Sequence, residues 1–600
     1  MLPEDRMNEQ MLRALVDQVR DGRLARRDFI GRMVALGVGV PLASAMLADI
    51  AVAQGSSSEA PYKPTRRGGG GPLRLLLWQG PTLLNPHFAT GTKDQEGCRP
   101  FYESLARYDA DGVLVPVLAA EIPSRANGGI AADGLSTTWK LRKNVNWHDG
   151  QPFTADDVVF NWQYATDPAG GAFSIGFYTN VKSVEKIDAS TVRINFVKPS
   201  PIWDRSCNIW MIPKHVFSAY MGAKSREAPA NQKPVGTGPY KFVAFTPGDL
   251  VRGEANLGYY LPNRPFFDTI EIKGGGDATS AARAVLQTGE FDYAWNVLVE
   301  DNVLKQMEAG GKGQMVFKPT GNAEMIMLNA ADPWTEVDGE RANVKSRHFA
   351  FSDPAVRKAF GLLVDRKSIL EFVFGRAATP SPNLLNNPAQ YNSKAIVPEF
   401  NVDKANALLD AAGWKRGGDG VRAKDGKRLK LVYQTSINSV RQKVQAIVKQ
   451  ACAKAGIEIE LKTVQASVFF SSDTANPDTY GKFFSDLEMY LNTRAGTDPD
   501  RFMQQWVSWE ICQKANGWQL QNKTRWSSPE YDKAFRAAEI ELDPVKRAAL
   551  FIQMNDMACN SGHSIPVALR AQVTALSKSI SAPLTGWDLD LSGIHDWYRA

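Results

Sequence analysis

Residues 138–158 read TWKLRKNVNWHDGQPFTADDV, and their pattern is the clearest structural signal in this chain of 600 residues. Polar and apolar residues alternate from Ser136 to Leu141, which is typical of a half-buried strand. Turn-forming residues follow over 144–150. Thr154 is then placed to cap a helix, and the carboxylate of Asp157, three residues later, to accept a hydrogen bond from the Thr154 amide. The stretch therefore predicts a strand, a tight connection and a helix.

Strand and helix patterns continue on both sides of this stretch. Before it, Leu73 to Trp78 predicts a buried strand, and Asp94 to Tyr108 has helical spacing. After it, residues 181–197 predict a strand pair, and residues 429–461 predict a strand–helix–strand unit. Helices that alternate with strands, with hairpins between them, predict a mixed α/β protein with two or three lobes.

The first 53 residues have the layout of an export signal. Arg26-Arg27 precede an uncharged apolar run, Met33 to Ala48, which ends near the small-x-small cleavage pattern Ala51-Val52-Ala53. The run has about sixteen residues, whereas a membrane-spanning helix needs about 20. The arginine pair resembles a twin-arginine signal, and a general secretory signal with a chance pair is the alternative. We expect residues 1–53 to be removed on export to the periplasm, and the Gly/Ser-rich residues 54–71 to form a flexible linker.

The composition is that of a folded protein without a nucleic-acid footprint. Hydrophobic residues make up 44% of the chain and charged residues 22%, so large packed cores are expected. The 70 Lys and Arg residues exceed the 64 Asp and Glu residues by a net charge of +6, and they form no basic block. No segment after residue 53 is apolar for long enough to span a bilayer, so we expect a soluble mature protein that binds no nucleic acid.

The sequence contains no recognisable catalytic or cofactor motif. GxSxG, HExxH, the phosphate-binding GxxxxGK[ST] and a GxGxxG after a strand are all missing. The six histidines are dispersed, and the five cysteines are widely spaced without a CxxC pair, so no metal or redox site is predicted. His148, beside Asp149, is better explained as a hydrogen-bonded turn residue. We expect a protein that is not an enzyme and has no cofactor; an exported hydrolase or a chaperone-like protein is a distant alternative.

Several tryptophans favour ligand binding as a set, because aromatic rings often form the walls of ligand clefts. For any single one of them, core packing is the better explanation. Trp295, at the end of the predicted strand 291–295, is the one that we take as a candidate ligand contact. The other members of the set are Trp78, Trp506, Trp509 and Trp518.

Four motifs, in order along the chain, resemble the family 5 extracellular solute-binding proteins. That family includes the dipeptide-, oligopeptide- and nickel-binding components of bacterial ABC importers. The first motif is the stretch 138–158 together with Pro116-Val117-Leu118-Ala119. The other three are Gly236-Thr237-Gly238-Pro239-Tyr240, the helix from Asp353 to Arg366, and the helix from Asp403 to Trp414. The similarity extends from Leu73 to the C-terminus.

The resemblance implies an α/β fold like that of the type II periplasmic binding proteins, with two lobes, a cleft and an extra domain in the first lobe. Lobe one is expected over 72–325, with the extra domain at about 114–235. Lobe two is expected over 326–564, and residues 565–600 are expected to return to lobe one. A ligand would lie in the cleft and be enclosed when the lobes close about a hinge.

The resemblance also implies three ligand-contacting segments, by position in the chain. Ala89-Thr90-Gly91 match a loop near the mature N-terminus. Thr435-Ser436-Ile437 follow the predicted strand at 429–433. Asn492-Thr493-Arg494-Ala495 precede the family's D-P-D-x-F segment, which is Asp498 to Phe502 here.

Two departures from the family pattern bear on the ligand. Dipeptide-binding relatives hold the peptide carboxylate with an arginine at the position of Thr435, and the ammonium group with an aspartate at the position of Ala495. Neither charge is present, and a buried ammonium without a counter-charge costs several kcal/mol. Arg494 is instead a candidate to bind a ligand carboxylate or phosphate, or it faces solvent. An oligopeptide or modified peptide is the first expectation, followed by an opine-like or sugar-derived solute and then by a metal chelate.

The family implies partners in the inner membrane, namely the permease and the ATPase of an ABC importer, and a monomeric binding protein. It also tends to carry a disulfide after the D-P-D-x-F segment. Cys512 matches one partner of that bridge, but Ser527 stands near the position of the other. We therefore do not expect this disulfide.

Overall fold

The computed structural model describes residues 62–600 except Thr90, 471–474, Ala495 and Gln519. Before residue 62 it describes only Leu15, Gln18, Leu24, Asp28, Phe29, Arg32 and Met33. The arginine pair and the cleavage pattern of the predicted export signal therefore lie outside the described residues. Within the described part of the chain, no helix is both long and apolar enough to cross a membrane.

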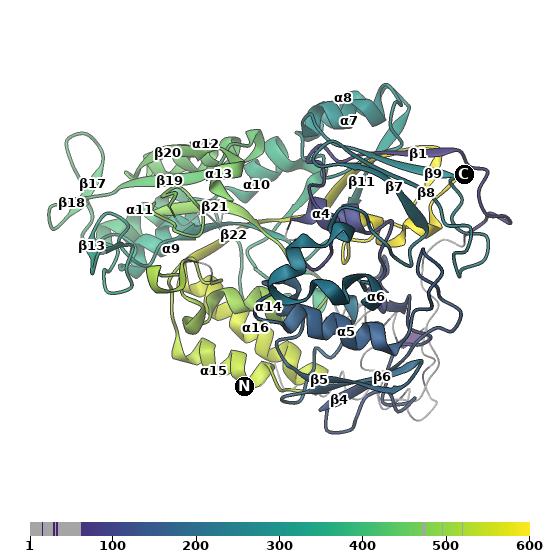
Figure 1. Cartoon of the computed structure of the whole chain (residues 1–600). Coiled ribbons are helices and arrows are strands. Elements are labelled where there is room, and N and C mark those ends of the chain that lie inside the picture. The colour runs from purple at the N-terminus through teal and green to yellow at the C-terminus, as the bar shows by residue number, and fades with distance from the viewer. Residues whose placement is uncertain are drawn as a thin grey trace.

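Lobe one is built on a seven-stranded sheet in the order β11-β23-β10-β1-β9-β8-β7 (Figure 1). The first strand, β1, pairs in parallel with β9 and β10, whereas β7, β8, β11 and β23 join by antiparallel pairing. Two helices, α7 (Ala278–Leu286) and α8 (Asp301–Glu308), pack their apolar residues against this sheet. The strands are β1 (Pro72–Leu76), β7 (Tyr240–Thr246), β8 (Leu250–Ala255), β9 (Thr269–Lys273), β10 (Tyr293–Ala294), β11 (Gly313–Lys318) and β23 (Gln572–Ser577).

Lobe two is built on a six-stranded sheet in the order β15-β22-β12-β21-β19-β20. Every residue of the central strand β12 is buried, because helices cover both faces of this sheet. The strands are β12 (Ala323–Leu328), β15 (Ala378–Pro380), β19 (Lys430–Ser436), β20 (Glu458–Val464), β21 (Leu487–Asn492) and β22 (Ser564–Arg570). The main helices are α9 (Pro354–Leu362), α11 (Val402–Ala411), α12 (Ser439–Lys454), α15 (Pro529–Ala538) and α16 (Pro544–Ser561).

The strand–helix–strand unit predicted over 429–461 is confirmed. Strands β19 and β20 pair in parallel, with Leu431 opposite Ile459, and α12 connects them. The Asn438 side chain caps α12 by accepting a hydrogen bond from the Arg441 amide at 3.1 Å.

The extra domain of lobe one contains a small sheet, β4-β6-β5, and helix α5 packed on it (Figure 1). Its elements are β4 (Ser136–Lys140), α5 (Ala155–Thr166), β5 (Val181–Asp188) and β6 (Thr191–Phe196). The predicted capping box of α5 is present. The Thr154 hydroxyl accepts from the Asp156 amide at 3.3 Å, and the Thr154 amide donates to the Asp157 carboxylate at 2.9 Å.

The chain crosses between the two lobes at two neighbouring places. One crossing is residues 319–322, between β11 and β12, and the other is Ala571, between β22 and β23. The Thr320 hydroxyl donates to the Arg570 carbonyl at 2.7 Å and so ties the two crossings together. The expected boundary after residue 325 thus falls inside β12, and β22 stays in lobe two although the return was expected from residue 565. The hydrophobic pattern does not reveal the boundary at β12, because Met325 and Ile326 on either side of it are both apolar.

Two other expectations need correction. The helix expected from Asp94 to Tyr108 is only α4 (Thr92–Cys98), and β2 (Ala106–Tyr108) follows it. Pro100 has no amide hydrogen for a helical bond, which limits the helix at this point. The expected flexible linker is described from Tyr62 onward, and that part is fastened to lobe one. The amides of Gly69 and Gly71 both donate to the Asp268 carboxylate, at 2.7 and 2.9 Å.

Candidate ligand-binding cleft

A cavity of about 610 Å³ lies between the two lobes. Such a volume falls within the usual range of about 300–1,000 Å³ for small-ligand sites. Lobe one contributes Thr92, Gln95, Phe173, Phe177, Arg205, Trp210 and Trp587, among others. Lobe two contributes Tyr480, Lys482, Tyr490, Asn492, Arg494, Arg501, Trp518 and Lys523, among others.

Aromatic rings form much of the lobe-two wall. Phe470, Tyr480 and Tyr490 pack edge to face or tilted against one another, with ring centres 5.1 to 6.2 Å apart. The Trp518 ring lies 4.7 Å from the ammonium group of Lys482. Interlocked rings lose little side-chain entropy when a ligand packs on them, so this wall offers a rigid apolar surface.

The acidic groups of the cavity are largely neutralised by the protein itself. Asp588 forms an ion pair with Arg99, whose guanidinium also lies 4.3 Å from the centre of the Trp210 ring. Asp498 forms a two-pronged ion pair with Arg547. Burial by itself would raise the pKa of Asp498, but the charge and hydrogen bonds of Arg547 outweigh it and hold that pKa below its ordinary value.

One ion pair of the cavity joins the two lobes. Arg205 of the extra domain lies 2.8 Å from the carboxylate of Asp500 in α14 (Asp500–Met503). Outside the cavity, Lys198 of the same domain pairs with Glu539 of lobe two at 3.0 Å. The extra domain is therefore held against lobe two by charged side chains from segments far apart in the sequence.

The segment 492–495 is the predicted site segment that lies at the cavity. Asn492, Thr493 and Arg494 all line it, and Ala495 lies outside the described residues. Arg494, however, is engaged by the protein. Its guanidinium donates to the Asn387 carbonyl at 2.6 Å and to the Thr497 carbonyl, and its amide donates to Asn322 at 2.8 Å. These contacts join Arg494 to the crossing at 319–322.

The first predicted segment lies behind the cavity wall. Ala89 is fully buried, and its carbonyl accepts from the side chain of Gln95, which does line the cavity. Gly91 is the residue that precedes α4, and Thr90 lies outside the described residues. The segment thus supports the cavity through α4.

The other predicted contacts do not line the cavity. Thr435 is buried in β19, and its hydroxyl donates to the Met489 carbonyl at 2.6 Å. The Ser436 hydroxyl accepts from Arg441 at 2.9 Å, and Ile437 is 45% exposed. Trp295 packs into the core of lobe one. The side chains of Thr435 and Ser436 are therefore engaged by the protein itself, Thr435 by the neighbouring strand β21 and Ser436 by helix α12.

Sequence reasoning missed most of the cavity. The sequence did not single out four of the lining residues, namely Trp210, Trp587, Lys482 and Lys523. Among the five tryptophans that it did single out, only Trp518 lines the cavity. Arg501 lines the cavity as well, although it had been seen only as the variable residue of the D-P-D-x-F segment. Aromatic and basic residues in irregular segments were the available signal, but nothing local shows which of them face a common space.

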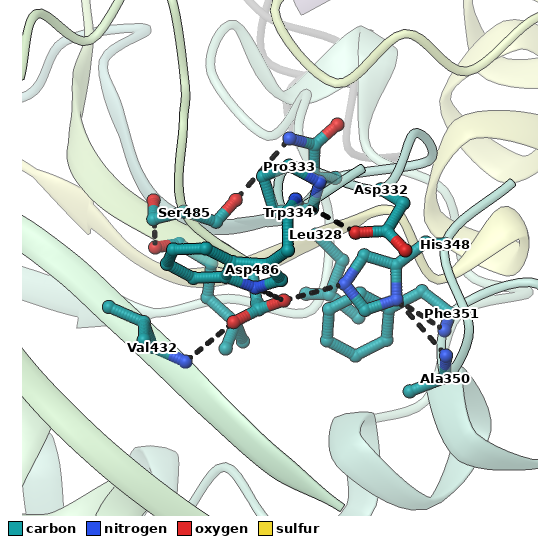
Figure 2. A network of polar contacts seen from close by, with 12 residues as sticks. Leu328, Asp332, Pro333, Trp334, His348, Ala350, Phe351, Val432, Ser485 and Asp486 are labelled. Carbon is teal, nitrogen blue, oxygen red and sulfur yellow. Dashed lines mark hydrogen bonds and ion pairs between the residues drawn. The ribbon is translucent and has the colours of Figure 1, made fainter. Parts of the chain in front are cut away.

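A buried His–Asp pair in lobe two invites a catalytic interpretation, and Figure 2 shows why it is structural. His348 Nε2 lies 2.9 Å from the Asp486 carboxylate, and both side chains are fully buried. His348 Nδ1 accepts hydrogen bonds from the amides of Ala350 and Phe351, at 3.1 and 3.0 Å. With Nδ1 engaged and Nε2 donating to Asp486, this imidazole has no free nitrogen to act as a base.

Asp486 accepts two further hydrogen bonds, from the Trp334 indole at 2.9 Å and from the Val432 amide at 2.7 Å (Figure 2). The network fixes β19, β21 and the loop before α9 to one another. Within the described residues, no group of three His, Cys, Asp or Glu side chains is arranged to hold a metal ion. The four cysteines whose side chains are described, Cys98, Cys452, Cys512 and Cys559, are free thiols.

Two open α/β sheets joined by two crossings, with a ligand-sized cavity between them, define a two-lobed binding protein of the type II periplasmic class. Residues 113–514 match the model of the bacterial extracellular solute-binding proteins, family 5. The chain belongs to this family, whose members are the solute-binding components of ABC importers. The resemblance inferred from the four motifs is thereby confirmed.

Curated relatives span nearly the same length. The glutathione-binding protein GsiB of Escherichia coli (strain K12) is 24% identical over 515 residues, which cover 85% of this chain and 92% of that protein. The oligopeptide-binding protein AppA of Bacillus subtilis (strain 168) is 29% identical over 458 residues, which cover 74% and 77%.

Solved structures show the same fold. NikZ from Campylobacter jejuni, in complex with Ni(L-His), has a TM-score of 0.72 at 23% identity and covers 88% of this chain and 99% of its own. AppA from Bacillus subtilis, in complex with a nonapeptide, has a TM-score of 0.71 at 24% identity and covers 90% and 100%. The predicted α/β two-lobed fold is therefore confirmed.

Proposed function

We propose that this protein captures an oligopeptide or peptide-like solute in the periplasm and delivers it to the permease and ATPase of an ABC importer. The observation that carries the proposal is the cavity between the lobes, walled by aromatic rings and lined by polar groups from both lobes. The relatives named above include binders of glutathione and of oligopeptides, which supports a peptide-like ligand. Ligand that touches both lobes stabilises the closed form, which is the form a membrane partner would recognise.

A second candidate ligand class is a non-peptide solute, such as an opine-like compound or an oligosaccharide. Its support is the burial of Thr435, whose position holds the carboxylate-binding arginine in dipeptide-binding relatives. With its hydroxyl bonded inside the sheet, Thr435 offers nothing to a peptide carboxylate. A dipeptide bound as in those relatives would therefore lack the residue that holds its carboxylate.

A thermal-shift screen of the purified protein distinguishes these classes. Pools of di- to pentapeptides, opine-type acids and oligosaccharides are added one at a time. A ligand at 100 times its Kd adds about 2.7 kcal/mol to the free energy of unfolding, so a raised Tm reports binding. A shift with peptide pools supports the proposal, and a shift with non-peptide pools alone replaces it by the second class. Mass spectrometry of the recovered ligand tests the absence of turnover, since a hydrolase would return cleavage products.

The export route is part of the same proposal. Arg26-Arg27 and the apolar run after them support twin-arginine export to the periplasm followed by cleavage near Ala53. The proposal also takes the mature protein to act there as a monomer. Replacing both arginines with lysine should leave the uncleaved protein in the cytoplasm, as seen by fractionation. Continued export of this variant would favour the general secretory route instead.

A further inference from the structure

Arg501 is a solvent-exposed cation at the cavity. It belongs to α14 of lobe two, and its guanidinium forms neither a hydrogen bond nor an ion pair with any of the described residues. The side chain extends toward lobe one, because a Cβ placed on Gly176 of the extra domain would lie 3.4 Å from Arg501 Nη1. Phe173 and Phe177, on either side of Gly176, line the same cavity.

A second guanidinium lines the same cavity. Arg205, which lines the cavity from lobe one, bonds to Asp500 through Nη2. Although Arg501 is exposed, partial enclosure by the protein and then the positive charge of Arg205 lower its pKa below the ordinary value, and the charge of Glu510 acts in the opposite direction. Arg205 is already paired with Asp500, whereas Arg501 forms no ion pair with the described residues, so an anion bound at this corner would supply the counter-charge of Arg501.

The rest of the cavity shows the same excess of positive charge. Its ionisable lining residues are Asp204, Arg205, Lys482, Arg494, Asp498, Arg501, Lys523 and Asp588. Of these acids, Asp498 and Asp588 already pair with arginines that do not line the cavity. Lys523 is only 7% exposed, and its ammonium group donates to the Cys512 sulfur at 3.2 Å and to the Trp518 and Leu520 carbonyls instead of to a carboxylate.

We propose that the cavity selects solutes of net negative charge, and that Arg501 binds a carboxylate of the solute at the corner that it shares with Arg205. A guanidinium presents two parallel N–H groups, which match the two oxygens of a carboxylate. Because the two arginines come from different lobes, the bound carboxylate also favours the closed arrangement. This inference rests on the proposed function and narrows its ligand to acidic peptides or acidic peptide-like compounds, such as opine-type acids.

Matched ligand pools test the charge requirement. Tetrapeptide pools rich in Glu with a free C-terminus are compared with the same pools carrying Gln and a C-terminal amide, and opine-type dicarboxylates form a third arm. Calorimetric titration should show at least ten-fold tighter binding of the acidic peptides or of the dicarboxylates than of the amidated pool. The preferred arm identifies which source supplies the carboxylate. Equal affinity for acidic and amidated pools would overturn the inference while leaving the proposed function intact, whereas no binding by any pool would overturn both.

Two variants locate the carboxylate. Arg501→Gln should weaken binding of the preferred acidic ligand at least ten-fold without lowering the Tm of the free protein, because Arg501 makes no hydrogen bond or ion pair to the described residues. Arg536→Gln is the matched control: Arg536 is an exposed arginine of lobe two that stacks on Trp509, bonds to Glu539 and lies away from the cavity lining. Unchanged affinity of the Arg501→Gln variant would overturn the assignment.

Discussion

His87 shows how a single polar residue can be held neutral inside this protein. Asn161 donates its amide hydrogens to the carbonyls of Asp157 and Ile212, so its oxygen must accept from His87 Nε2 at 2.8 Å. His87 Nδ1 therefore accepts from the Ser174 hydroxyl at 2.6 Å. Burial lowers the pKa of His87 to about 4. The neutral imidazole is thus part of the packing between α5 and the loop after β1.

We predict that His87 makes the protein sensitive to mild acid. Its pKa is lower in the folded chain than the ordinary 6.5, so its contribution to stability is complete above pH 6.5 and is lost as the pH falls toward 4. The loss from this group is about 1.4 kcal/mol per pH unit in that window. Urea unfolding at pH 7.5 and 5.0 should show a smaller acid-induced loss for His87→Gln than for the unchanged protein. An equal loss in both proteins would contradict the assignment.

At the scale of elements, α5 illustrates how neighbours in sequence define a helix start. Asp157 has two tasks: one carboxylate oxygen accepts from the Thr154 amide, and the other accepts from the Lys214 amide at the start of α6 (Lys214–Phe217). The adjacent Asp156 points outward and pairs with Lys186 and Lys214 on the surface. Of these two consecutive aspartates, Asp157 therefore holds backbone amides in place, whereas Asp156 forms only surface ion pairs.

We predict that replacements at this helix start rank by the hydrogen bonds that they remove. Thr154→Ala should lower the free energy of unfolding by about 1 kcal/mol, the usual cost of losing a cap. Asp157→Ala should cost about 1–3 kcal/mol, because it leaves two backbone amides without an acceptor. Asp156→Ala is the control, since exposed ion pairs contribute about 0–1 kcal/mol. Urea unfolding measures all three, and a loss for Asp156→Ala as large as that for Asp157→Ala would refute the ranking.

At the scale of the whole molecule, the two crossings between lobes are the natural place for movement. Arg494 braces one of them from lobe two: a Cβ on Gly321 would lie only 2.6 Å from Arg494 Cδ. Farther along the cleft, the ion pairs Arg205–Asp500 and Lys198–Glu539 hold the extra domain to lobe two. The position of one lobe relative to the other therefore depends on the packing of Arg494 against Gly321 at the crossing and on the ion pairs between the extra domain and lobe two.

We predict that Gly321→Ala destabilises the protein by about 1–3 kcal/mol, the usual cost of overpacking. In an Arg494→Ala background the added methyl group meets less of the clashing side chain, so the same change should cost less. The difference between the two costs, measured by urea unfolding, is the coupling between the crossing and Arg494. Gly361→Ala in α9 is the control, because a Cβ there meets no atom within 4 Å. If Gly321→Ala lowers the free energy of unfolding by the same amount in both backgrounds, the proposed contact between Arg494 and the crossing is contradicted.

The local secondary structure of this protein could be predicted from the sequence. The cap of α5, the hairpin of β5 and β6, and the β19–α12–β20 unit all depend on residues near one another in the chain. Ordered motifs also predicted the family, which the match over residues 113–514 confirms. Element ends were less predictable where a proline or a buried apolar run changed the outcome, as at α4 and β12.

The cavity itself was decided by tertiary structure. Its lining extends from Thr92 to Leu589 and is brought together only because the chain crosses between lobes twice. Thr435 and Arg494 are polar residues whose hydrogen-bonding groups the fold uses internally, whereas the charge of Arg501 at the cavity forms no ion pair with the described residues. Whether a polar side chain finds a partner depends on residues distant in the sequence: Met489 is 54 residues from Thr435, and Asn387 is 107 residues from Arg494. The sequence by itself therefore determined the elements and the family, and long-range packing determined which side chains remain available to a ligand.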